Sequence, residues 1–143
     1  MIRRATRADA ADIARVHVAT WQFAYAEILA PEQIASVTVA DRIAIWERVL
    51  AEDAPVWVAE VNGRIVGFAS ADGAWLTSLY VDPVAQGAGV GTALLDEAER
   101  AGASQLQVLA GNGHARAFYT GRGWREVGEG DIYRGEPTRR YAK

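Results

Sequence analysis

The chain has 143 residues, half of them hydrophobic, with 15 Lys and Arg against 18 Asp and Glu and a formal net charge of −3. This length fits one domain of about 100–200 residues, and the small negative charge gives no electrostatic reason to expect a nucleic acid or a membrane surface as partner. The absence of cysteine excludes disulfides, thiolate metal sites and a cysteine nucleophile, and with only two histidines we expect no metal site.

Hydrophobic patterns in the first part of the chain predict a strand, two helices and three further strands. In chain order these elements cover residues 2–5, 9–21, 31–50, 56–61, 64–69 and 75–81. Thr6 is a good N-cap for the first helix, and the second helix could start later than Pro31. Asn62-Gly63 between two β-rich runs predicts a type I′ hairpin. Asp72-Gly73 is expected to turn the chain into the third strand of a meander.

The second part of the chain predicts two helices and three strands. A helix over residues 89–101 is followed by a strand over 105–109, and a helix begins at the N-cap Asn112 and stops before Gly123. The last two predicted strands cover residues 124–127 and 138–141. The predicted order is therefore β-α-α-β-β-β-α-β-α-β-β.

A glycine-rich turn at residues 86–92 lies between the strand ending Leu-Tyr-Val-Asp-Pro and an apolar-periodic helix. Backbone amides in such a turn can approach a pyrophosphate, and the first N–H groups of the helix point at the same anion. A Walker-type loop needs a lysine after its last glycine, where this chain has Thr92. The dinucleotide fingerprint G-x-G-x-x-G needs its third glycine three residues after the second, whereas the glycines of this chain lie two residues apart, at 87, 89 and 91. A turn without a ligand needs only one or two glycines, so we interpret this one as a phosphate site.

The spacing Gln86-x-x-Gly89-x-Gly91 resembles the acetyl-CoA-binding motif of the GCN5-related N-acetyltransferase (GNAT) superfamily. A downstream segment, from Asn112 to Trp124, is similar to the N-x-x-A-x-x-F-Y-x-x-x-G-F/W pattern of that family. The order of elements also matches, so the resemblance covers nearly the whole chain. It implies one α/β (α+β) domain, residues 1–143, with a mixed, mostly antiparallel central sheet flanked by helices.

The resemblance implies direct transfer of an acetyl group from acetyl-CoA to an amine of a small molecule or peptide. The backbone N–H of Leu79 would polarise the thioester carbonyl, and Tyr119 would protonate the departing thiolate. Read from the residues alone, Tyr119 could instead be an amphipathic surface tyrosine. The residues implied to hold acetyl-CoA are Leu79, Tyr80, Val81, Gln86, Gly87, Ala88, Gly89, Val90, Gly91, Thr92, Asn112 and Tyr119.

The general base is open, because this chain has Trp75 where many relatives carry a glutamate before the Leu-Tyr-Val run. An indole cannot accept the proton of an ammonium substrate. The remaining candidates are the carboxylates of Glu27, Glu60 and Asp82, or a relay water held by Thr77 or Ser78.

The acceptor pocket implied by the resemblance would include Trp21, Tyr25 and Trp75. Trp21 and Tyr25 are four residues apart and share a helix face, which favours packing over substrate contact. Trp75 could be packed at the end of its strand or could stack on a cationic amine. His17, on the same helix as Trp21, is expected to be a core histidine, and His114 is expected to be exposed.

Two other classes of function remain open at this point. The same fold could bind an acyl-CoA as a non-catalytic sensor, which the missing carboxylate at Trp75 favours and the phenol of Tyr119 disfavours. An unrelated phosphate-binding domain would be stabilised by ATP or NAD instead. The acceptor and the length of the acyl chain are open, and the resemblance allows a homodimer. The chain has no apolar run of about 18 residues and no signal-peptide core, so we expect a cytoplasmic protein with no membrane partner.

Overall fold

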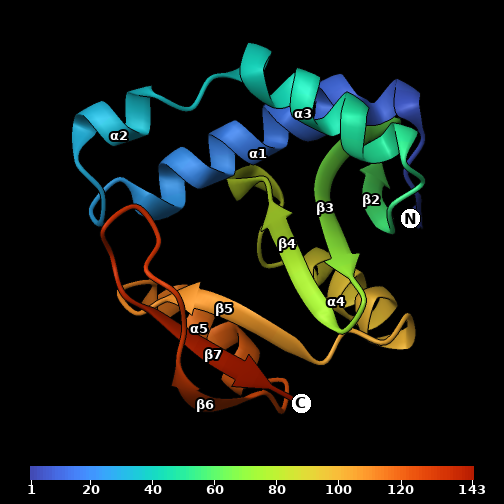
Figure 1. The fold of residues 1–143 in the computed structure, drawn as a ribbon. Helices are drawn as coiled ribbons and strands as arrows, with labels where there is room; N and C mark the ends of the chain where they lie inside the picture. Colours follow the sequence, from blue (N-terminus) through green and yellow to red (C-terminus); the bar gives the residue numbers. More distant parts are fainter. The chain divides into compact units, whose positions relative to one another are not determined.

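The computed structural model of the protein describes all 143 residues and consists of two compact units, Met1–Ala103 and Ser104–Lys143 (Figure 1). None of its helices combines the length and the apolar character needed to cross a bilayer.

Four antiparallel strands form the sheet of the Met1–Ala103 unit, in the order β1-β2-β3-β4. They are β1 (Ile2–Arg4), β2 (Val56–Val61), β3 (Arg64–Asp72) and β4 (Trp75–Val81). The helices of this unit are α1 (Ala10–Tyr25), α2 (Pro31–Ala35), α3 (Val39–Ala51) and α4 (Val90–Arg100). Helix α1 packs on α3 and on β3 and β4, whereas α4 packs on β2, β3 and β4 (Figure 1).

The two faces of this sheet carry different helices. Phe68 of β3 faces the cluster formed with α1 and α3. The next position toward the N-terminus, Gly67, faces the other way, where a Cβ would lie 3.2 Å from the side chain of Leu94 in α4. Successive residues of a strand point to opposite faces, so α1 and α3 cover one face and α4 covers the other.

Local turn chemistry agrees with the predictions at the first hairpin and decides the start of the second helix. Asn62 and Gly63 both have positive φ, 53° and 75°, as the predicted type I′ turn requires. The second helix, predicted to run from Pro31 or later to Leu50, has the later start, because the chain is extended at Thr38 (φ −114°, ψ 154°) and residues 31–35 form a short helix of their own. The Thr38 side chain accepts a hydrogen bond from the N–H of Asp41 and so starts α3 as a separate helix.

The Ser104–Lys143 unit has three strands with β7 (Thr138–Ala142) between β5 (Gln105–Leu109) and β6 (Arg125–Glu129), antiparallel to both. Helix α5 (Gly113–Thr120) begins at Asn112, whose Oδ1 accepts a hydrogen bond from the N–H of Ala115 at 3.1 Å. Apart from the extra helix α2, the predicted order of elements and the α/β class are confirmed.

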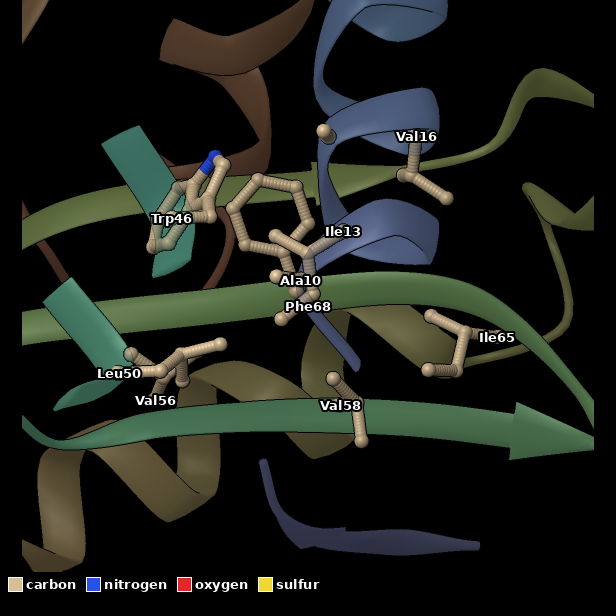
Figure 2. Packing of buried hydrophobic residues seen from close by; sticks show 10 residues of the cluster. Ala10, Ile13, Val16, Trp46, Leu50, Val56, Val58, Ile65 and Phe68 are labelled. Carbon is tan, nitrogen blue, oxygen red and sulfur yellow. The ribbon is translucent and has the colours of Figure 1, made fainter. Parts of the chain in front are cut away.

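Aromatic and aliphatic side chains from α1, α3 and the sheet fill the core of the Met1–Ala103 unit (Figure 2). Figure 2 shows Ile13 from α1 and Trp46 from α3 facing Phe68 of β3. Phe68 is 0% exposed. Its ring lies 5.1 Å from that of Trp46 and 5.6 Å from that of Tyr80, centroid to centroid. These contacts join α1 and α3 to the sheet.

Replacing Phe68 with Ala should lower the free energy of unfolding by about 3–5 kcal/mol, because the lost ring leaves a cavity among packed side chains. Denaturant unfolding followed by fluorescence measures the change. Phe23→Ala is the control, since Phe23 is 67% exposed and its loss should change stability by less than about 0.5 kcal/mol. Equal effects of the two substitutions would contradict the described packing.

Candidate functional site

The backbone of β4 directs alternate peptide groups to its two edges. The N–H of Asp82, just beyond the strand, donates to the carbonyl of Val66 at 2.7 Å. Hydrogen-bonded and non-hydrogen-bonded pairs alternate along antiparallel strands. Leu79 and Val81 therefore point their N–H and C=O groups away from β3. This orientation is the one that the predicted role of the Leu79 N–H requires.

The chain leaves β4 through a short 3₁₀ turn, η2 (Pro83–Ala85), which two side chains hold in place. The carboxylate of Asp82 accepts a hydrogen bond from the N–H of Val84 at 3.1 Å. Gln86 Nε2 donates to the carbonyl of Val81 at 3.0 Å, and the Gln86 N–H donates to the carbonyl of Pro83 at 3.4 Å. In this structure Gln86 fastens the turn to the end of β4, and its backbone amide, predicted to hold phosphate, already has a partner.

Gln86 and Gly87 form a hydrogen-bonded turn, and beyond it the backbone N–H groups of residues 89–91 donate to no protein acceptor. Gly87 and Gly89 have φ values of 86° and 80°, and a Cβ at either position would meet nothing within 4 Å. Glycine adopts this conformation without strain. The open row of donors continues into the first turn of α4, where the helix dipole favours an anion. These residues fit a pyrophosphate group, as the sequence predicts.

His17 of α1 lies in an aromatic cluster on the α1 face of β4. Its Nδ1 accepts a hydrogen bond from Trp46 Nε1 at 3.1 Å, and its ring stacks on Tyr80 with the centroids 5.0 Å apart. Burial lowers the pKa of His17 to about 4, with a smaller contribution from the positive charge of Arg42. Because Nδ1 accepts, the single proton of the neutral ring is on Nε2. His17 is therefore a neutral hydrogen-bond donor at neutral pH.

A cavity of about 640 Å³ opens beside this cluster, between α3 and the β3–β4 hairpin. We call it the hairpin pocket. Its lining includes His17, Trp46, Glu52, Ser70, Asp72 and Ser78. The chain contains no group of three or more His, Cys, Asp or Glu side chains placed to hold a metal ion.

The residues predicted for the acceptor pocket do not line this cavity. Trp21 is 1% exposed and packs edge-to-face against Tyr25, with 5.3 Å between centroids. Trp75 is the half-buried first residue of β4, opposite Asp72 of β3. Packing thus accounts for Trp21. Of the residues that line the hairpin pocket, the sequence analysis named Thr77 and Ser78 as holders of a relay water but did not predict the cavity. The only sequence signal for it was the presence of hydroxyl residues in otherwise apolar strands.

Two of the three carboxylates that were considered as the general base already accept hydrogen bonds within the protein. Glu60 accepts a hydrogen bond from Arg3 at 3.0 Å, and Asp82 caps the turn as described. Glu27 is exposed after the end of α1. Thr77 and Ser78, predicted to hold a relay water, both line the hairpin pocket.

In the Ser104–Lys143 unit, Tyr119 is buried rather than a surface tyrosine, with 8% of its surface exposed. Its ring packs edge-to-face against Phe118 and Trp124, at 5.3 and 6.0 Å between centroids. The side-chain oxygen of Asn112 caps α5 by accepting a hydrogen bond from the N–H of Ala115. The side-chain N–H₂ of Asn112 can still donate hydrogen bonds to another group. His114 is exposed, as predicted.

The family model and the solved structures that resemble this chain point to the same family. Residues 52–126 match the family model described as "Acetyltransferase (GNAT) domain". No curated protein sequence matches the chain.

Several solved structures are similar over the whole chain. A GCN5-related N-acetyltransferase from Rhodopseudomonas palustris is 30% identical, with a TM-score of 0.79, over 100% of this chain and 95% of that one. The PaiA N-acetyltransferase of Thermoplasma acidophilum, in complex with coenzyme A, is 20% identical, with a TM-score of 0.76, over 100% and 98%. YncA of Salmonella typhimurium, solved with its cofactor acetyl-CoA, is 24% identical, with a TM-score of 0.70, over 99% and 91%.

Acidification should destabilise the fold through His17. The pKa of His17 is about 4 in the folded chain against an ordinary value of 6.5, so between these pH values the unfolded chain binds more protons. We expect the His17 contribution to be complete above about pH 6.5 and to fall by up to about 3 kcal/mol as the pH drops to 4. Denaturant unfolding of the wild type and His17→Gln across this range measures it. Identical pH slopes for the two proteins would contradict the assignment.

Proposed function

Because the chain belongs to the GNAT acetyltransferase family, we propose that it transfers an acetyl group from acetyl-CoA directly to an amine of a small molecule or peptide. The observation that carries this proposal is the row of unpartnered N–H groups at residues 89–91, which follows the glycine-rich turn. Coenzyme A contains a pyrophosphate, which such a row at a helix N-terminus can bind through several hydrogen bonds.

The chemistry assigns one step to each of two residues. The N–H of Leu79 hydrogen-bonds the thioester carbonyl oxygen, which becomes negatively charged when the neutral amine attacks the carbonyl carbon. The new N–C bond forms, the C–S bond breaks, and the thiolate takes the phenolic proton of Tyr119. Tyr119 regains a proton from the acylated nitrogen. An acceptor that arrives as an ammonium ion loses its first proton to water, held for example by Thr77 or Ser78.

Several finer features of the proposal come from the sequence. Asn112 would donate its amide N–H₂ to the cofactor arm while its oxygen caps α5. The family model runs from residue 52 to 126 and so includes parts of both units, which supports the proposal of one acetyltransferase domain. A cytoplasmic location and a homodimer stay predictions.

A non-catalytic acyl-CoA sensor is the second candidate. It is favoured by Trp75 in the place of a carboxylate and by the engaged carboxylates of Glu60 and Asp82. Thiol release from acetyl-CoA, measured over a panel of amines, separates the two. Acceptor-dependent release supports the transferase. Stabilisation by acetyl-CoA without release for any amine supports the sensor.

Gly89→Glu should weaken acetyl-CoA binding about 10- to 100-fold, a loss of about 1.4–2.8 kcal/mol, because it places a carboxylate against the pyrophosphate. Titration calorimetry measures the Kd. Gly63→Glu is the matched control, since Gly63 also has a positive φ, 75°, and open space around its Cβ. An unchanged Kd for Gly89→Glu would contradict the assignment of this turn as the pyrophosphate-binding site.

Tyr119→Phe should lower kcat by about 10²- to 10⁴-fold, because the leaving thiolate loses its proton donor. The Kd of acetyl-CoA should change little, since the ring and its packing remain. Tyr133→Phe, a change at an exposed tyrosine of the same unit, should leave both values as they are. Full activity of Tyr119→Phe would show that Tyr119 contributes only to packing and is not the proton donor.

A further inference from the structure

We propose that the hairpin pocket binds the acceptor and that this acceptor is an amine carrying a second positive charge, such as a diamine. The inference rests on the proposed acetyl transfer and names the substrate class for it.

The pocket lies beside the proposed reaction centre. Thr77 and Ser78, which line it, directly precede Leu79 in β4. An amine in the pocket therefore lies along the same strand that supplies the proposed oxyanion donor. Entry from this side requires no contribution from Trp21 or Trp75.

Two hydroxyl groups lie side by side in the pocket wall, one on the buried Ser70 and one on the exposed Thr77. The side chain of Ser70 has one hydrogen bond, the 2.7 Å contact of its Oγ with Thr77 Oγ1. Each hydroxyl has one proton and two lone pairs, so the pair keeps lone pairs that can accept further hydrogen bonds. A neutral amine nitrogen can donate its N–H groups to them and keep its own lone pair for the attack.

The charged side chains that line the pocket are all carboxylates, although the positive charge of Arg42 also acts on His17 in the pocket wall. Glu52 and Asp72 have no ion-pair partner, and Asp53 lies 4.0 Å from the guanidinium of Arg4. No lysine or arginine lines the cavity, and His17 is neutral. This rim favours a cation. The reacting nitrogen must be neutral when it attacks, so the charge that the rim attracts belongs to a second nitrogen.

The wall contributed by α3 fits the body of such a molecule. Ile45, Trp46 and Val49 line it, which gives methylene groups an apolar surface. We therefore assign the hydroxyl pair to the reacting amine, the α3 wall to the carbon chain and the carboxylates to the distal ammonium. In the reaction the near nitrogen loses one proton to water, forms the N–C bond and passes its next proton to Tyr119, while the distal ammonium is unchanged.

The test compares 1,4-diaminobutane with 1-aminobutane, which differ in the second nitrogen. Titration calorimetry with the protein saturated with coenzyme A, at low ionic strength, measures binding without turnover. We expect the diamine to bind about five- to tenfold more tightly, the effect of two surface ion pairs, and added salt to reduce this ratio. In Glu52→Gln/Asp72→Asn the ratio should fall to about one. Glu47→Gln/Asp96→Asn removes the same charge at exposed positions outside the pocket and should keep the ratio.

Thiol release provides the second measurement. The Glu52→Gln/Asp72→Asn variant should raise KM for the diamine and leave KM for the monoamine unchanged. Equal affinities of the two amines for the wild type, or a diamine preference that survives the double substitution, would overturn the proposal. If the double variant fails to fold, the single substitutions and the wild-type ratio decide. Failure of the transfer itself has a different signature, namely no coenzyme A binding or no thiol release with any amine.

Discussion

The packing of the neutral His17 ring against Tyr80, with its Nδ1 accepting from the Trp46 indole, is the interaction on which the Met1–Ala103 unit depends. It joins α1, α3 and β4 at one point and lies against the fully buried Phe68. Protonation would place a charge among aromatic rings and turn Nδ1 from acceptor into donor, which removes the Trp46 hydrogen bond. The same ring lines the hairpin pocket, so the core and the proposed acceptor site share one neutral imidazole.

Strand β4 serves packing and chemistry through the alternation of its backbone. Tyr80 turns its side chain to the α1 face, while Leu79 and Val81 turn their peptide groups to the edge away from β3. Beyond the strand, the side chains of Asp82 and Gln86 form hydrogen bonds within the turn and so hold the segment between β4 and α4 in place. The end of β4 therefore leads directly to the row of N–H donors, for which we propose a pyrophosphate ligand.

Local signals predicted most of the fold. The positive φ of Asn62 and Gly63, the cap at Asn112 and the glycines of residues 86–92 each depend on residues close in the chain, and the structure has them as predicted. Over residues 31–50 the sequence analysis left the start of the helix open, and the cap at Thr38 fixes it at Val39. The side-chain role of Gln86 was not predicted, because its acceptor, the carbonyl of Val81, is reached only once the 3₁₀ turn has formed.

By itself the sequence determined the order of elements, the glycine conformations of the turn and the family, because glycine conformation, helix caps and hydrophobic periodicity act over a few residues. Only the tertiary structure decided which polar groups meet. The hydrogen bond between His17 and Trp46 spans 29 positions, and the hairpin pocket gathers groups from α1, α3, β3 and β4. Contacts of this kind set the charge of the imidazole, bury Trp21 and bring the Ser70 and Thr77 hydroxyls together in the pocket wall. Burial and hydrogen-bond partners depend on distant segments that no local pattern encodes.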